Sequence, residues 1–265
     1  NYVDVGIAEE HAVAMASALA KGGCKPVFCV WSSFVQRTYD QLSQDLAINN
    51  NPAVILVFAG AISGMDVTHL GSFDIPLISN IPNIVCLAPA DKEEYLAMLN
   101  WGLEQREHPV VIRVPLEVSS AALPVERDYG ALNRYQVVRR GSGVAVLALG
   151  SFFGLGRQVV DGLKEHGIDA TLINPRFVSG LDEELLENLK KNHRLVITLD
   201  DGVLDGGFGE KIARFYGASG MKVLNYGGKK EFTDRVPVEE LYERYRLKKE
   251  LIAEDVLKCL SVAVC

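Results

Sequence analysis

Glu9, Glu10 and His11 place three ionisable side chains together near the start of a predicted helix over residues 7–21. Such side chains can exchange protons with a bound molecule. Carboxylates in a first helical turn also complement the helix dipole, and spacing alone favours this ordinary explanation of both glutamates. A lone histidine beside them is more often packed or solvated than reactive.

Two later segments carry further side chains that could contact a ligand. Trp31 and Phe34 lie where a short predicted strand over residues 26–31 gives way to a predicted helix over 33–48. His69 lies in residues 59–79, a glycine-containing loop that is long for a compact domain and is therefore a functional candidate. Core packing is the ordinary alternative for the two aromatic residues, and a solvated loop residue is the alternative for His69.

Apolar runs that alternate with helical segments indicate parallel sheets covered by helices on both faces. Further strands are predicted at residues 53–58, 84–87, 110–114, 144–149, 170–173, 195–199 and 222–224. Further helices are predicted at residues 91–105, 155–166, 182–192, 208–216, 237–246 and 250–262. We therefore predict an α/β protein with one domain over residues 1–118, a linker over 119–140 and a second domain over 141–265.

Composition supports a globular protein and excludes several functions. The 265 residues are 48% hydrophobic and 23% charged, which is enough chain for two ordinary domains. A net charge of −7 without a basic cluster argues against nucleic acid as the main partner. No apolar run approaches the length of a membrane span.

The five cysteines are scattered and form no C-x-x-C pair, and the first residues do not resemble a signal peptide. We therefore expect a reduced, cytoplasmic setting. Cys29 and Cys86 lie in apolar runs and are expected to be buried thiols. Because the chain has no initiator methionine and starts at an apparent strand end, we expect that upstream chain is missing.

Four segments, taken together, resemble the transketolase type of thiamine-diphosphate enzyme. Asp4-Val5-Gly6-Ile7-Ala8-Glu9-Glu10-His11-Ala12 is similar to the start of the pyrimidine-binding domain in these enzymes. The stretch from Trp31 to Gln41 resembles the aromatic segment of 1-deoxyxylulose-5-phosphate synthases and other transketolases, and that from Thr68 to Asp74 resembles their histidine loop. In the second half, the similarity to the C-terminal domain of that synthase is carried by Asn174-Pro175-Arg176-Phe177-Val178, Leu181-Asp182-Glu183 and Gly206-Gly207-Phe208-Gly209.

The resemblance covers nearly the whole chain in the same order. It implies a pyrimidine-binding domain, apparently lacking its N-terminal part, followed by a transketolase-like C-terminal domain. The implied function is that of a thiamine-diphosphate-dependent carboligase subunit, which transfers a two-carbon ketol-type unit between sugar-like substrates.

The same resemblance assigns roles to six residues. It implies that the Glu9 carboxyl group hydrogen-bonds the cofactor's aminopyrimidine ring, so that the cofactor can act as a carbanion. It implies that Phe34 stacks on the pyrimidine, with Ile7, Trp31 and Arg37 bordering the same pocket. His69 would face the substrate as a hydrogen-bond donor or proton shuttle.

The chain lacks the Gly-Asp-Gly turn with which this family holds the diphosphate and its Mg²⁺. Asp200-Asp201-Gly202, followed by Asn225, is a superficial mimic without the first glycine, so we expect no metal ligand in this chain. The resemblance therefore implies a diphosphate-binding domain or subunit as partner, in a homodimer or a two-plus-two heterotetramer.

Three positions depart from the synthase pattern on the substrate side. Phe58 and Leu116 stand where the synthases carry arginines that clamp the substrate phosphate, a role suited to a planar bidentate cation. Met65 stands where an aspartate is expected four residues before the histidine, and Asp66 follows one place later. These changes indicate an altered donor or acceptor while the cofactor side is kept.

Two other functions fit the sequence less well. One is the β-subunit of a 2-oxoacid dehydrogenase decarboxylating component, which has the same two domains and an equivalent glutamate. The other is a non-catalytic module that keeps the fold for assembly, which the altered substrate residues allow.

Overall fold

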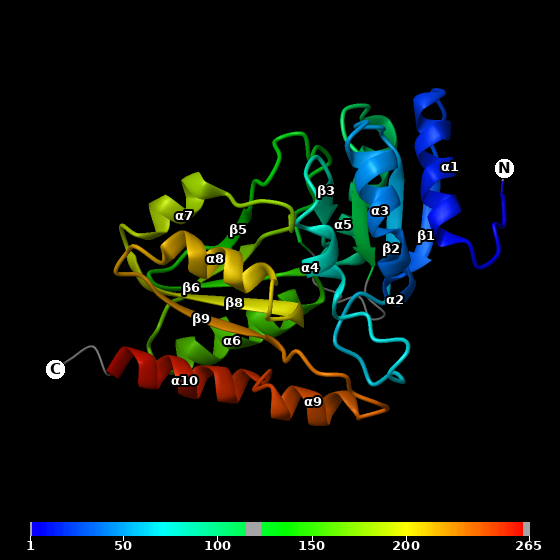
Figure 1. The fold of residues 1–265 in the computed structure, drawn as a ribbon. Coiled ribbons are helices and arrows are strands. Elements are labelled where there is room, and N and C mark those ends of the chain that lie inside the picture. Colours follow the sequence, from blue (N-terminus) through cyan, green and yellow to red (C-terminus); the bar gives the residue numbers. More distant parts are fainter. Residues whose placement is uncertain (1, 115–122, 262–265) are drawn as a thin grey trace.

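A computed structural model describes residues 2–114 and 123–261, and it contains two mainly parallel sheets flanked by helices (Figure 1). This agrees with the predicted α/β class. No helix within the described ranges is long and apolar enough to span a membrane.

The first sheet has the strand order β1-β2-β4-β3, and each neighbouring pair is parallel. Its central strands are apolar along their whole length because helices cover both faces. β1 is one of the two edge strands, and its residues Val27, Cys29 and Trp31 are exposed. The expected burial of Cys29 is therefore wrong, whereas Cys86 in β3 is fully buried. The strands are β1 (Val27–Trp31), β2 (Val54–Phe58), β3 (Val85–Leu87) and β4 (Val110–Val114).

The helices of this half are α1 (Glu9–Lys21), α2 (Ser32–Val35), η1 (Gln36–Thr38), α3 (Tyr39–Gln41), η2 (Leu42–Ala47), α4 (Asp74–Ile78) and α5 (Lys92–Glu104). The single helix predicted over 33–48 is thus broken into α-helical, 3₁₀ and π-helical turns. The Thr38 hydroxyl donates to Val35 O at 2.7 Å, which is the kind of local bond that competes with a regular helix. α4 lies inside the stretch that was expected to be loop.

The second sheet has the order β5-β7-β6-β8-β9, in which only β5 is antiparallel to its neighbour. Its strands are β5 (Gln136–Arg139), β6 (Gly143–Ala148), β7 (Thr171–Asn174), β8 (His193–Val203) and β9 (Lys222–Gly228). β5 falls within the predicted linker, and β8 extends four residues beyond its predicted end. The helices are η3 (Gly150–Phe152), α6 (Phe153–Glu165), α7 (Glu183–Leu189), α8 (Phe208–Tyr216), α9 (Val238–Arg244) and α10 (Lys249–Ser261).

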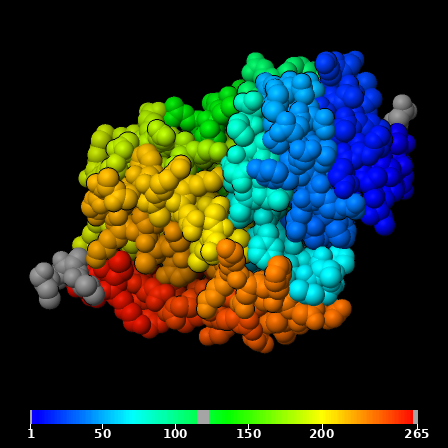
Figure 2. All heavy atoms as spheres, viewed as in Figure 1, coloured from blue at the N-terminus to red at the C-terminus, as the bar shows by residue number. Residues whose placement is uncertain are grey.

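The two halves share a core and are joined by backbone hydrogen bonds. One buried cluster contains Val57 and Cys86 from the first sheet together with Leu147 and Phe208 from the second half. Val178 N donates to Cys86 O at 2.8 Å, beside an isolated bridge between β3 and the chain after β7. In Figure 2 the segment before α9, in orange, lies directly against the loop that follows β2, in cyan. The halves therefore pack as one body.

Candidate functional site

Glu9 is the first residue of α1, where its carboxylate faces the positive end of the helix dipole. Arg37 of η1 reaches across to this turn. Its Nη1 lies 3.0 Å from Glu9 Oε2, and its Nη2 lies 3.2 Å from Glu10 Oε1. The Glu9 side chain is only 13% exposed, against 37% for Glu10, so the two neighbouring carboxylates have different surroundings.

Glu9 lines a groove of about 530 Å³ that runs along the free edge of β1. Trp31 and Phe34 line the same groove, so three of the predicted cofactor residues come together from α1, β1 and α2. Apolar side chains such as Met15 and Val30 form much of the remaining wall. A carboxylate beside aromatic and aliphatic walls suits a flat heteroaromatic ring that carries hydrogen-bonding nitrogens.

The two other residues predicted to border the cofactor pocket, Ile7 and Arg37, do not line the groove. Ile7 is 84% exposed and does not line the groove. Arg37 also lies outside its lining, and it contacts the groove through Glu9.

His69 lies at the rim of the groove, where its ring contacts Phe34. Their ring centroids are 5.4 Å apart at an interplanar angle of 71°, an edge-to-face contact. On its other side, His69 Nδ1 lies 3.0 Å from Asp66 Oδ1 and 2.9 Å from Thr68 Oγ1. Hydrogen bonds from the Thr68 hydroxyl and from His69 hold the pKa of Asp66 well below its usual range. Sequence reasoning did not find this aspartate as a partner of the histidine.

Glycines and a buried serine shape the start and end of the histidine loop. The Ser32 hydroxyl donates to Gly71 O at 2.7 Å. A Cβ added at Gly71 would lie 1.7 Å from Ala59 O, and one at Gly60 would lie 2.3 Å from Asp74 Oδ2. Neither position has room for a side chain, so the loop can pack this closely only with glycine there.

A buried ionic network lies beneath this loop. Arg113 of β4 donates from Nε to Asp74 Oδ2 at 2.7 Å and from Nη1 to Asp201 Oδ1 at 2.6 Å. Its Nη2 donates to Gly60 O at 2.5 Å and to Asp74 Oδ1 at 3.0 Å. Burial alone would lower the pKa of Arg113, but the charges of Asp201 and Asp74 outweigh it and raise the pKa. An arginine within an otherwise apolar predicted strand was the sequence signal for such a network.

Asp200 and Asp201 act as structural groups in the second half. Asp200 accepts from the backbone N of Gly202 at 2.8 Å and of Phe208 at 2.7 Å. Burial, followed by the charge of Asp201, raises the pKa of Asp200 to about 6. Among residues 2–114 and 123–261, no group of three or more His, Cys, Asp or Glu side chains is placed to hold a metal ion. The oxygens of Asp200 and Asp201 are already bonded to backbone amides, Arg113 and Ser151, so this pair does not fit Mg²⁺.

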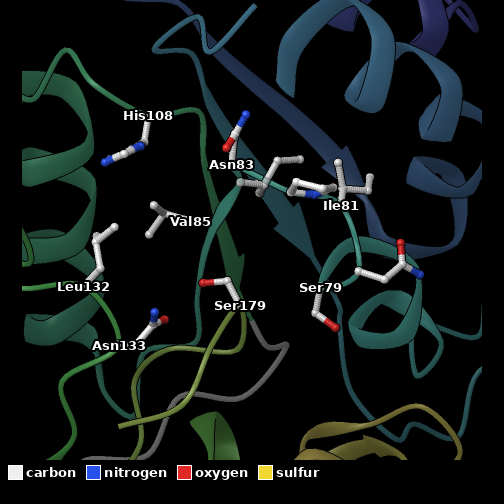
Figure 3. A pocket seen from close by; sticks show the side chains of 11 residues that line it. Ser79, Ile81, Asn83, Val85, His108, Leu132, Asn133 and Ser179 are labelled. Carbon is white, nitrogen blue, oxygen red and sulfur yellow. The ribbon is translucent and has the colours of Figure 1, made fainter. Parts of the chain in front are cut away.

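A separate cavity of about 340 Å³ opens on the seam between the two halves (Figure 3). Its described lining includes Asn83, His108, Asn133 and Ser179 but no carboxylate. Because it contains none of the predicted site residues, it is distinct from the candidate site.

The substrate-side departures are only partly within the described residues. Phe58 is half-buried at the end of β2, and Met65 is half-buried with its carbonyl oxygen accepting from Arg235 N at 3.0 Å. Leu116 lies outside the described residues.

Family models match both halves of the chain. The transketolase pyrimidine-binding domain matches residues 1–118, and the transketolase C-terminal domain matches residues 133–252. Two similar curated proteins are 1-deoxy-D-xylulose-5-phosphate synthases. The protein from Clostridium tetani is 38% identical over 97% of this chain, and that from Symbiobacterium thermophilum is 37% identical over 96%. These alignments cover 42% and 39% of the two relatives, so the chain spans about two-fifths of their length.

Solved structures share the fold at lower identity. A chain described as a split gene transketolase in an inactive beta4 tetramer superposes with a TM-score of 0.82 at 23% identity, covering 97% of this chain and 83% of that one. A transketolase from Pichia stipitis gives a TM-score of 0.74 at 14% identity, covering 93% and 36% respectively.

Proposed function

The chain belongs to the transketolase family, and on this premise we propose that it is the pyrimidine-binding and C-terminal portion of a thiamine-diphosphate-dependent carboligase. It would transfer a two-carbon ketol-type unit between sugar-like substrates. The observation that carries this proposal is the convergence of Glu9, Phe34 and His69, from three separate segments, on one groove and its rim.

The groove fits the pyrimidine end of thiamine diphosphate. When bound, this cofactor supplies a nucleophilic carbon that can add to a carbonyl group. The Glu9 carboxyl group would form a hydrogen bond with the ring nitrogen and exchange a proton with it. Phe34 and Trp31 would keep water away from the ring. His69, at the rim, would exchange a proton with the substrate.

The diphosphate and Mg²⁺ would belong to a partner domain or subunit. The chain contains no Gly-Asp-Gly turn, and its adjacent aspartates are occupied by Arg113 and by backbone amides. Exposed apolar side chains line the same groove as Glu9, among them Tyr2, Val3 and Leu19. Contiguous exposed apolar surface of this kind suits a protein interface, so we place the partner there, in a homodimer or a two-plus-two assembly in a reduced, cytoplasmic setting.

The substrate would differ from that of the synthases if Phe58, Met65 and Leu116 replace the polar groups that contact its phosphate. No cation would then stand at Phe58 or Leu116 to pair with a phosphate dianion. A substrate with fewer charges at that end is the expected consequence.

The test is reconstitution with a diphosphate-binding partner, Mg²⁺ and thiamine diphosphate. Glu9→Gln should lower turnover by about a hundredfold or more, the usual scale for a general acid–base group. Glu10→Gln is the matched control, because Glu10 also pairs with Arg37 but does not line the groove. Unchanged turnover in the Glu9 variant would show that its assignment is wrong. Absence of cofactor binding by calorimetry in the assembled wild-type complex would favour a non-catalytic assembly module.

A further inference from the structure

All polar contacts of the His69 ring fall on one of its two nitrogens. Nδ1 lies 3.0 Å from Asp66 Oδ1 and 2.9 Å from Thr68 Oγ1. Nε2 has no hydrogen-bond partner among the residues that the structure describes. The edge-to-face contact with Phe34 fixes the plane of the ring, so the two nitrogens cannot exchange places by small rotations.

The neighbours of Asp66 show which atom carries the proton. Asp66 Oδ1 accepts from Thr68 N at 3.0 Å and from the Thr68 hydroxyl at 2.5 Å. These bonds and His69 keep the pKa of Asp66 low, so the group is a carboxylate with no proton to donate. The single hydroxyl proton of Thr68 is directed to Asp66, which leaves Thr68 Oγ1 as an acceptor toward the ring. Both contacts at Nδ1 therefore require an N–H there.

We propose that Asp66 and Thr68 fix neutral His69 in its Nδ1-protonated tautomer, which leaves Nε2 as a hydrogen-bond acceptor toward the bound substrate. Asp66 is then a positioning residue, because it acts through His69. The step to substrate rests on the proposed function. The proposed tautomer narrows the substrate to a molecule with a hydroxyl group that can donate a hydrogen bond to Nε2. A carbonyl oxygen cannot do this because it carries no proton.

Backbone contacts on both sides of Asp66 hold its carboxylate toward the histidine. Residue 65, four places before His69, is methionine, and its carbonyl oxygen is tied to Arg235 N. Val67 N donates to Asp234 Oδ1 at 3.2 Å. These contacts hold the backbone on both sides of Asp66, and its carboxylate folds back onto the turn that ends in His69.

The tautomer can be measured on the 265-residue chain without cofactor by nitrogen-15 NMR of labelled histidine, at a pH where the ring is neutral. His69→Gln identifies the signals among the five histidines. We expect a protonated Nδ1 and an unprotonated Nε2 in the wild type. Asp66→Ala should convert this single tautomer into a mixture of both.

Asp234→Asn is the matched control, because Asp234 supports the same loop but does not contact the ring. It should leave the tautomer unchanged, whereas a general loss of loop structure would alter it in both variants. A wild-type ring protonated at Nε2 overturns the proposal, and so does an Asp66→Ala variant that keeps the Nδ1-protonated form. Because the measurement needs no cofactor, a failure of thiamine diphosphate to bind would refute the proposed function and leave the tautomer result standing.

Discussion

Replacing Arg113 by methionine should destabilise the chain more than any change of an exposed ionic pair. Arg113 is 2% exposed and makes four hydrogen bonds, two of them to Asp74 in α4 and one to Asp201 in β8. Methionine keeps a long apolar side chain but removes the charge and all four hydrogen bonds. Among the described residues, Asp74 would then keep the amide of Ile75 as its partner, and Asp201 the amide and hydroxyl of Ser151.

The expected loss in the free energy of unfolding comes from the two carboxylates that remain buried without a cation. Two carboxylates that are at most 2% exposed would lose their shared cation. Removing one partner of a buried ion pair costs about 3–5 kcal/mol, because the remaining charge is left uncompensated. Since single domains are stable by about 5–15 kcal/mol, such a loss is a large part of the total. Adding Asp74→Asn and Asp201→Asn to Arg113→Met should return part of the lost stability.

Urea unfolding at pH 7, followed by circular dichroism, measures the difference. Arg139→Met is the control, because Arg139 pairs with Asp161 on the surface at 2.8 Å with both side chains more than a third exposed. That change should cost less than about 1 kcal/mol. A loss below about 1 kcal/mol for Arg113→Met, or a triple variant less stable than the single one, would refute the reasoning about uncompensated charge.

Three further predictions concern single positions elsewhere in the chain. The folded-state pKa of Asp200 is about 6, which is above its unfolded value. The protonated carboxyl group therefore adds about 3 kcal/mol to the free energy of unfolding below about pH 4, and this contribution is lost as the pH rises to 6. Asp200→Asn should remove this pH-dependent contribution, as measured by urea unfolding at several pH values. Gly71→Ala should cost roughly 1–3 kcal/mol and displace the histidine loop, because its Cβ would meet Ala59 O. Gly162→Ala, inside α6 with open space around its Cβ, should be stabilising by about 0.5–1 kcal/mol in the same assay.

Much of the fold could be predicted from local hydrophobic patterns, because these patterns agree with the way the elements pack. The continuous apolar runs became parallel strands because helices cover both faces, as in β2 and β4. The errors lie where a tertiary contact decides the outcome. The predicted linker supplied β5, whose half-buried residues 136–139 gave no strong strand pattern and whose place is set by pairing with β7. Cys29 is exposed because it lies with Val27 and Trp31 on the side of β1 that faces the groove, which an apolar run does not reveal.

The candidate site was predictable as a set of residue types, but its geometry was not. Glu9, Phe34 and His69 were named from sequence segments, and the structure brings them to one groove and its rim. Sequence could not indicate that Asp66 turns back to His69, since a carboxylate one place earlier or later can point to another face of a loop. The arginine in an apolar strand signalled a buried network, but its partners could not be identified, because the two carboxylates come from residues far apart in the chain.

The second half of the chain determines where the histidine loop lies. Ile62 N donates to Asp201 O at 2.8 Å, and Val203 N donates to Ser72 O at 3.0 Å. Between these two points, the segment around Asp234 and Arg235 bonds the loop backbone directly on both sides of Asp66. The segment that carries His69 is thus held at both ends and at its middle by residues after position 200. The second half, from which none of the described groove residues comes, therefore helps to position His69 relative to Phe34, and a change in its packing would reach the site through this loop.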